Sequence, residues 1–144
     1  MRALSIDLDD LVLALDSNGV EFYLDLETGE VRFRPEDDVD PEFEQLLKKQ
    51  PKRFLPITPW SSSDGFYLMQ RFARKEVDDE AVRQALEVAL EGKKPFRSFK
   101  DRLYDFPGLP DAWHRFQAVE QHRWARHWLA EHDIEPSPAS PRDV

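Results

Sequence analysis

Cysteine is absent from this chain of 144 residues, which excludes disulfide bonds, thiolate catalysis and cysteine-ligated zinc. Long apolar runs are missing too, because none approaches the roughly 20 residues that span a bilayer. Acidic residues interrupt the N-terminal stretch, which therefore lacks the apolar core of a signal peptide. These absences predict a soluble, cytoplasmic protein that does not enter a membrane.

Basic residues are in the minority: 20 Lys and Arg stand against 29 Asp and Glu, a net charge of −9. The imbalance is uneven, since residues 1–50 carry 5 basic and 14 acidic residues whereas residues 93–129 carry 8 and 4. Overall acidity disfavours non-specific binding to a phosphate polyanion, although a local basic surface can still bind phosphate. A hydrophobic fraction of 40% is typical of a folded protein rather than a disordered one.

Apolar residues at helical spacing follow several residues that favour the start of a helix. These starts are Asp7, Asp40, Ser61, Asp78, Pro95 and Asp111. Between the first two of them, Val20–Leu26 and Val31–Arg34 alternate around a glycine-containing turn, which predicts a β-hairpin. The proline-rich run Phe54–Trp60 is predicted to add a short edge strand.

The order of these elements predicts an α+β fold, in which a small antiparallel hairpin or three-stranded sheet packs against about five or six helices. The length suits one compact domain, which we place at residues 1–134. Residues 135–144 are rich in proline and serine, and we expect them to form a disordered tail.

Three stretches of the sequence, taken together and in their order along the chain, are distinctive. They are Tyr-Leu-Asp-Leu-Glu-Thr-Gly-Glu-Val at residues 23–31, the helix residues 66–72, and Gly-Lys-Lys-Pro-Phe-Arg-Ser-Phe-Lys-Asp at residues 92–101 followed by Trp113-x-x-Phe116. In this combination the chain resembles a widespread bacterial family of small cytosolic proteins, over about residues 6–134. The resemblance implies a soluble, single-domain protein with no established activity, and it lends no catalytic residues.

The segment from residue 93 to residue 126 concentrates cations and aromatic side chains in an otherwise acidic protein. Its candidate anion-binding or partner-binding residues are Lys93, Lys94, Arg97, Lys100, Arg102 and Arg115. One interpretation places the aromatic residues in the core and leaves the cations solvated or paired with the acidic N-terminal half. The other makes the segment a surface for phosphate, nucleic acid or a protein partner.

Metal binding and catalysis find little support in the sequence. Successive histidines at 114, 122, 127 and 132 are eight, five and five residues apart, whereas a helical metal site needs ligands three or four apart. The acidic clusters lack the alternating ligands and central glycine of a calcium loop. The sequence therefore predicts no metal, no cofactor and no assigned catalytic residue.

Trp60 follows the proline-rich run and is either a core side chain or a candidate contact residue at an interface. The sequence favours a non-enzymatic module that binds a protein partner or self-associates, with the acidic half meeting the basic segment 93–126 between chains or within one. Two alternatives remain open. The first is nucleic-acid or phosphate binding through that basic segment, and the second is an enzyme with an unrecognised site near His114.

Overall fold

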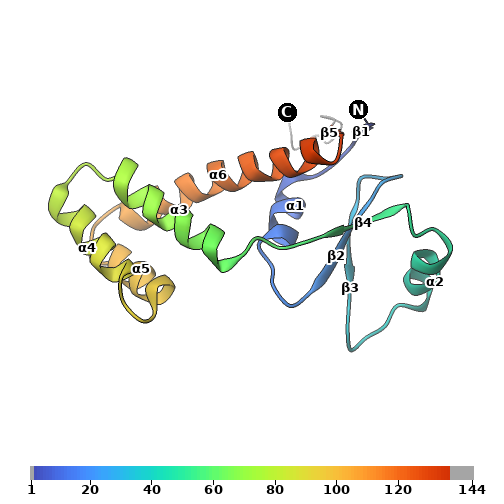
Figure 1. Cartoon of the computed structure of the whole chain (residues 1–144), viewed down its shortest axis with the longest axis horizontal. Coiled ribbons are helices and arrows are strands. Elements are labelled where there is room, and N and C mark those ends of the chain that lie inside the picture. Colours follow the sequence, from blue (N-terminus) through green and yellow to red (C-terminus); the bar gives the residue numbers. More distant parts are fainter. Residues whose placement is uncertain (1, 137–144) are drawn as a thin grey trace. The chain divides into compact units, whose positions relative to one another are not determined.

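The computed structural model of the chain describes residues 2–136. It contains two compact units, one formed by the residues up to Trp60 together with those from Gln121 on, the other by Ser61–Glu120. We call the first the strand unit and the second the helical unit. In the described residues there are six helices, a three-stranded antiparallel sheet and a two-stranded parallel pair (Figure 1), which confirms the α+β prediction.

The sheet of the strand unit is built from β2 (Glu21–Asp25), β3 (Val31–Arg34) and β4 (Phe54–Ile57), in the order β3-β2-β4. Both pairings are antiparallel, and Phe22 lies opposite Phe33 in one and opposite Ile57 in the other. The predicted hairpin and edge strand are therefore confirmed. Pro56 is tolerated in β4 because an edge strand has one side that needs no ladder hydrogen bonds.

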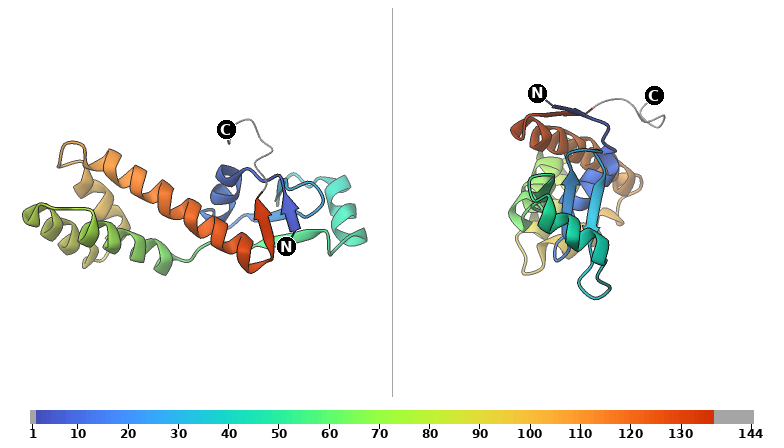
Figure 2. Two further views of the ribbon diagram at one scale, coloured as in Figure 1. Left: turned by 90° about the horizontal axis from the view of Figure 1, so that it is seen from above. Right: turned by 90° about the vertical axis from the view of Figure 1, so that its right-hand side faces the viewer.

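A parallel pair joins β1 (Arg2–Leu4) to β5 (Ile134–Pro136), with Leu4 opposite Pro136 (Figure 2). The sequence does not predict this pair, because strands of three residues are too short to show an alternating pattern. Glu135 and Pro136, which the sequence assigns to a disordered tail, belong to β5, and residues 137–144 lie outside the described residues. A single domain over residues 1–134 stays a prediction.

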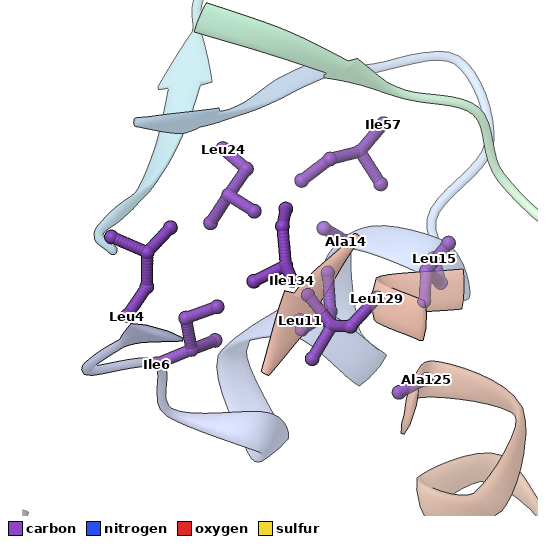
Figure 3. Close-up of a cluster of buried hydrophobic side chains, with 10 residues drawn as sticks. All are labelled: Leu4, Ile6, Leu11, Ala14, Leu15, Leu24, Ile57, Ala125, Leu129 and Ile134. Atoms are coloured by element: carbon purple, nitrogen blue, oxygen red, sulfur yellow. The ribbon is translucent and has the colours of Figure 1, made fainter. Parts of the chain in front are cut away.

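Helices α1 (Leu8–Leu15) and α2 (Pro41–Lys49) cover the two faces of the sheet. Toward α1 and the end of α6, the sheet contributes side chains to a continuous buried cluster (Figure 3). The cluster consists of Leu4, Ile6, Leu11, Ala14, Leu15, Leu24, Ile57, Ala125, Leu129 and Ile134. On the other face, the Phe43 ring of α2 meets the rings of Phe54 and Tyr23 edge-on, at centroid distances of 5.2 and 6.0 Å.

The helical unit is formed by α3 (Ser62–Lys75), α4 (Glu80–Leu90), α5 (Pro95–Leu103) and the residues of α6 (Leu109–Glu131) up to Glu120. Ser61 and Asp64 close a capping box at the start of α3. The core of the unit is aromatic: the ring centroids of Phe72, Phe99 and Trp113 lie 5.1 to 6.3 Å apart in pairs.

Two predicted helix starts are wrong by one or two residues. The cap of α4 is Asp79 rather than Asp78, because the Asp79 carboxylate accepts hydrogen bonds from the backbone N–H groups of the first turn. Helix α6 begins at Leu109 rather than after Asp111. Pro110 does not break it, since a proline in the first turn removes an N–H that has no helical acceptor anyway.

Among the described residues, no helix combines the length and the apolar character needed to cross a bilayer. The cytoplasmic location stays a prediction.

Candidate functional site

Within the basic-aromatic segment of residues 93–126, residues 93–120 belong to the helical unit and contain α5 and the first part of α6, whereas residues 121–126 belong to the strand unit. Phe99 and Trp113 are buried there, and their rings pack against each other and against Phe72. Phe96 and Phe116 are half-buried. These aromatic side chains stabilise the unit, and the cations of α5 lie on its polar side.

Two of the candidate cations are paired with acids of their own segment. The Arg102 guanidinium lies 2.7 Å from Asp105, and Arg97 lies 3.9 Å from Asp101. All four side chains are more than half exposed, so these pairs contribute little to stability. The partners come from the helical unit and not from the acidic N-terminal half, which differs from the predicted pairing.

The other four candidate cations, Lys93, Lys94, Lys100 and Arg115, are exposed. Within the described part of the chain, no carboxylate forms an ion pair with them. Residues 93–100 hold four cations and no acid, and we call them the cationic segment. The charge of its three lysines, Lys93, Lys94 and Lys100, is therefore available to an anionic ligand or partner.

A pocket of about 170 Å³ lies beside this segment, between the end of α5 and the first turns of α6. Its lining residues are Lys100, Leu103, Tyr104, Pro110, Trp113, His114 and Gln117. Leu103 and Trp113 are buried, so the base of the pocket is apolar, whereas Tyr104 is 74% exposed at the rim. Of the six candidate cations, Lys100 belongs to this lining.

Trp60 is half-buried in the strand unit, at the margin of its hydrophobic cluster. Its backbone N–H donates to the Leu15 carbonyl at 2.7 Å, and its ring meets the Trp124 ring edge-on at 5.2 Å. The side chain thus helps to close the core from a loop. Its predicted role as a contact residue stays a prediction.

Two histidines of α6 each have a carboxylate partner. His122 lies 2.7 Å from Asp9, and His127 lies 2.9 Å from Glu131 on its own helix. No group of three or more described His, Asp or Glu side chains is arranged to hold a metal ion. These histidines act as surface hydrogen-bonding groups.

The most buried carboxylate of the strand unit belongs to Asp25, whose residue is 1% exposed at the end of β2. Arg53 donates two hydrogen bonds to it, from Nε and Nη2, both 2.9 Å long. Burial alone would raise the pKa of Asp25, but the hydrogen bonds from Arg53 and from the Glu27 backbone outweigh it and hold the pKa below its usual value. This pair fixes the hairpin turn to the start of β4.

A second ion-pair cluster surrounds Arg34 at the end of β3. Its guanidinium binds both oxygens of Glu44 on α2, at 2.6 and 2.8 Å, and one oxygen of Glu21 at 3.0 Å. The hydrogen bonds from Arg34 hold the pKa of Glu44 below its usual value. Burial raises the pKa of the Tyr23 phenol, and its hydrogen bond to Glu21 adds to this effect. The cluster ties the sheet to α2.

Comparison with protein-family models matches residues 1–141 to an uncharacterised protein family, UPF0158. The chain belongs to this family. The UPF0158 protein PA5073 of Pseudomonas aeruginosa is 40% identical over 137 residues, which cover 95% of this chain and 89% of that relative. No solved structure matches the chain. Membership in UPF0158 confirms the resemblance to an uncharacterised bacterial family, while the three motifs quoted for it stay a prediction.

For this UPF0158 member, the sequence singles out the cations but not the pocket beside them. Tyr104 and Gln117 were not predicted as site residues, because neither belongs to a charged or catalytic pattern. The sequence does not predict the Asp25–Arg53 pair either, and the signal that could have pointed to it is a charged residue at the end of an alternating run. Its partner Arg53 lies 28 residues away, so no local pattern connects the two.

Acidification is expected to destabilise the strand unit. Asp25 and Glu44 have lower pKa values in the folded chain than in the unfolded chain, where they titrate near about pH 4. As the pH falls, the unfolded state therefore takes up protons before the folded state does. The stability that the charged Asp25 and Glu44 contribute is complete above about pH 5 and is lost as the pH falls through their folded pKa values. Urea unfolding between neutral and acid pH should show a falling midpoint.

The Glu44→Gln variant should show a shallower decline than the natural sequence, because one of the two titrating groups is gone. A midpoint that stays level or rises on acidification would contradict the assignment of these pairs.

Proposed function

We propose that this UPF0158 protein is a non-enzymatic binding module whose helical unit binds an acidic segment of a protein partner. The observation that carries the proposal is the pocket at Lys100, Tyr104 and Trp113, which joins an apolar base to a cationic rim. Lys93 and Lys94 add exposed positive charge at the start of α5, the helix that contributes Lys100 to the pocket.

The size of the pocket favours one side chain of a partner over a free small molecule. Its volume of about 170 Å³ is below the about 300–1,000 Å³ that is common for small-molecule sites. The apolar base formed by Leu103 and Trp113 suits an apolar side chain. Lys100 at the rim suits carboxylates that flank it, and an exposed tyrosine such as Tyr104 is typical of interfaces.

Binding is a better account of this pocket than catalysis. His114 lines it, but no carboxylate does, so the pocket lacks the acid that would orient or activate a catalytic histidine. The shifted pKa values of Asp25 and Glu44 are explained by ion pairs that connect elements of the strand unit.

Binding to single-stranded nucleic acid or phosphate is the second candidate. The exposed Tyr104 ring beside Lys100 and His114 resembles the combination of stacking and positive charge that single strands require. The net charge of −9 opposes it, because a polyanion is repelled at long range.

Charge reversal on the cationic segment is expected to abolish binding of an acidic peptide. The probe is a fluorescein-labelled peptide of aspartates around a single leucine, and binding is read by fluorescence anisotropy at low ionic strength. The triple variant Lys93→Glu, Lys94→Glu and Lys100→Glu should lower the affinity at least about tenfold, since each lysine faces solvent without an acidic partner among the described residues. Salt should weaken binding to the natural chain.

A matched control carries Lys48→Glu, Lys49→Glu and Lys52→Glu. These lysines are also exposed and change the net charge equally, but they belong to the strand unit. Equal losses in both variants, or no peptide binding at all, would refute the proposal. A labelled oligothymidine that binds where the peptide does not would support the second candidate instead.

A further inference from the structure

We propose that the pocket of the helical unit receives the loop of residues 36–40 from a second copy of this chain. The inference rests on the proposed function, because it uses the same pocket and the same cationic segment. It names the partner that the charge pattern of the chain itself provides.

The loop connects β3 to α2 and carries four acids around one apolar residue. Its residues are Glu36, Asp37, Asp38, Val39 and Asp40, and all are exposed. Val39 is 55% exposed, although it is an apolar side chain. Asp40 caps α2 by accepting a hydrogen bond from the Glu42 backbone N–H at 3.1 Å, which holds the end of the loop in place.

The loop and the pocket match in size, in apolar character and in charge. Val39 is a single apolar side chain of the size that the pocket holds, and it would be removed from water against Leu103 and Trp113. Asp37 and Asp38 precede Val39 in the chain. In the described structure these two acids form no ion pair, and neither do the lysines of the cationic segment. The pocket therefore suits an acidic loop that carries an exposed apolar residue at its centre.

Loop and pocket are different surfaces, so the contact between copies is heterologous. Each copy that inserts its loop leaves its own pocket open to the next copy, which produces a ring or a growing chain unless two copies exchange loops mutually. In every case the average mass must rise with protein concentration and fall with salt, because opposite charges approach at the contact.

Sedimentation velocity at low ionic strength tests this directly. The natural chain should exceed the monomer mass at about 100 μM and return toward it in about 0.5 M salt. The loop variant Asp37→Lys/Asp38→Lys and the triple lysine-to-glutamate variant should each remain monomeric. An equimolar mixture of the two variants should associate again, because the reversed loop then meets the reversed segment.

Two further variants separate the loop from general charge effects. Val39→Ser should weaken self-association about tenfold while leaving every charge in place. The variant Glu76→Lys/Asp78→Lys changes two exposed acids of the helical unit, and it should leave self-association unchanged. Circular dichroism of each variant confirms that it is folded.

A chain that stays monomeric at every concentration would overturn the inference. If that monomer still bound the acidic peptide through Lys93, Lys94 and Lys100, the proposed function would stand and a different protein would be its partner. Association that survives both charge reversals would also overturn it, because another surface would then join the copies.

Discussion

Replacing Gly29 with alanine is expected to destabilise the strand unit by about 3 kcal/mol. Gly29 has a φ of +81°, a left-handed conformation that costs any residue with a β-carbon. A β-carbon at this position would also clash with the Ser5 carbonyl oxygen. The backbone between β1 and α1 would have to move, which disturbs the buried cluster around Ile6.

Gly19→Ala is the matched control for this clash. Gly19 has nearly the same φ, +82°, but nothing lies within 4 Å of a β-carbon there. The free energy of unfolding of the Gly19→Ala variant should therefore fall by about 1 kcal/mol, from backbone strain alone. Urea unfolding can be followed by tryptophan fluorescence, because Trp60, Trp124 and Trp128 all belong to the strand unit. Equal losses in the two variants would show that the Ser5 contact carries no energy.

Asp25→Asn is expected to cost about 3 kcal/mol, because it removes the buried carboxylate that pairs with the largely buried Arg53 guanidinium. The value lies at the lower end for such pairs, since the Arg53 side chain keeps 18% of its surface exposed and a second acid, Glu27, lies 3.3 Å from it. Asparagine keeps the oxygen that accepts the hydrogen bond from the Glu27 backbone. The loss therefore measures the charge pair and not the turn. Urea unfolding monitored by circular dichroism provides the measurement.

The double variant Asp25→Asn/Arg53→Met should recover most of this loss, because it removes both charges together. Glu21→Gln serves as a control at the exposed pair of Arg34 and Glu21, whose side chains are 38% and 58% exposed. It should lower the free energy of unfolding by only a small fraction of the loss in Asp25→Asn. If the double variant were as unstable as the single variants combined, the pair would not be coupled as the distances imply.

Local signals in the sequence predicted most helix starts and the hairpin correctly. Asp7, Asp40 and Ser61 each cap the helix that they were predicted to cap. A cap acts on backbone groups two or three residues away, so its effect is readable from neighbouring residues. The same locality explains the errors at Asp78 and Asp111, where several residues in a row could begin a helix.

The candidate site was predicted in part. The cations were found from composition, but their immediate partners, Asp101 for Arg97 and Asp105 for Arg102, depend on which rotamers the helix presents. Tyr104 and Gln117 join the pocket because α5 packs beside the first turns of α6. No periodicity in either helix shows that packing.

By itself, the sequence determined the class of fold, the helices and the hairpin, and the contrast between an acidic loop and a cationic segment. All of these follow from interactions among residues close together in the chain. The tertiary structure alone decided three further features: the parallel pairing of β1 with β5, the ion pair of Asp25 with Arg53, and the pocket at Lys100. Each joins residues that are distant in sequence, and such contacts form only when the packing of the core brings their backbones together.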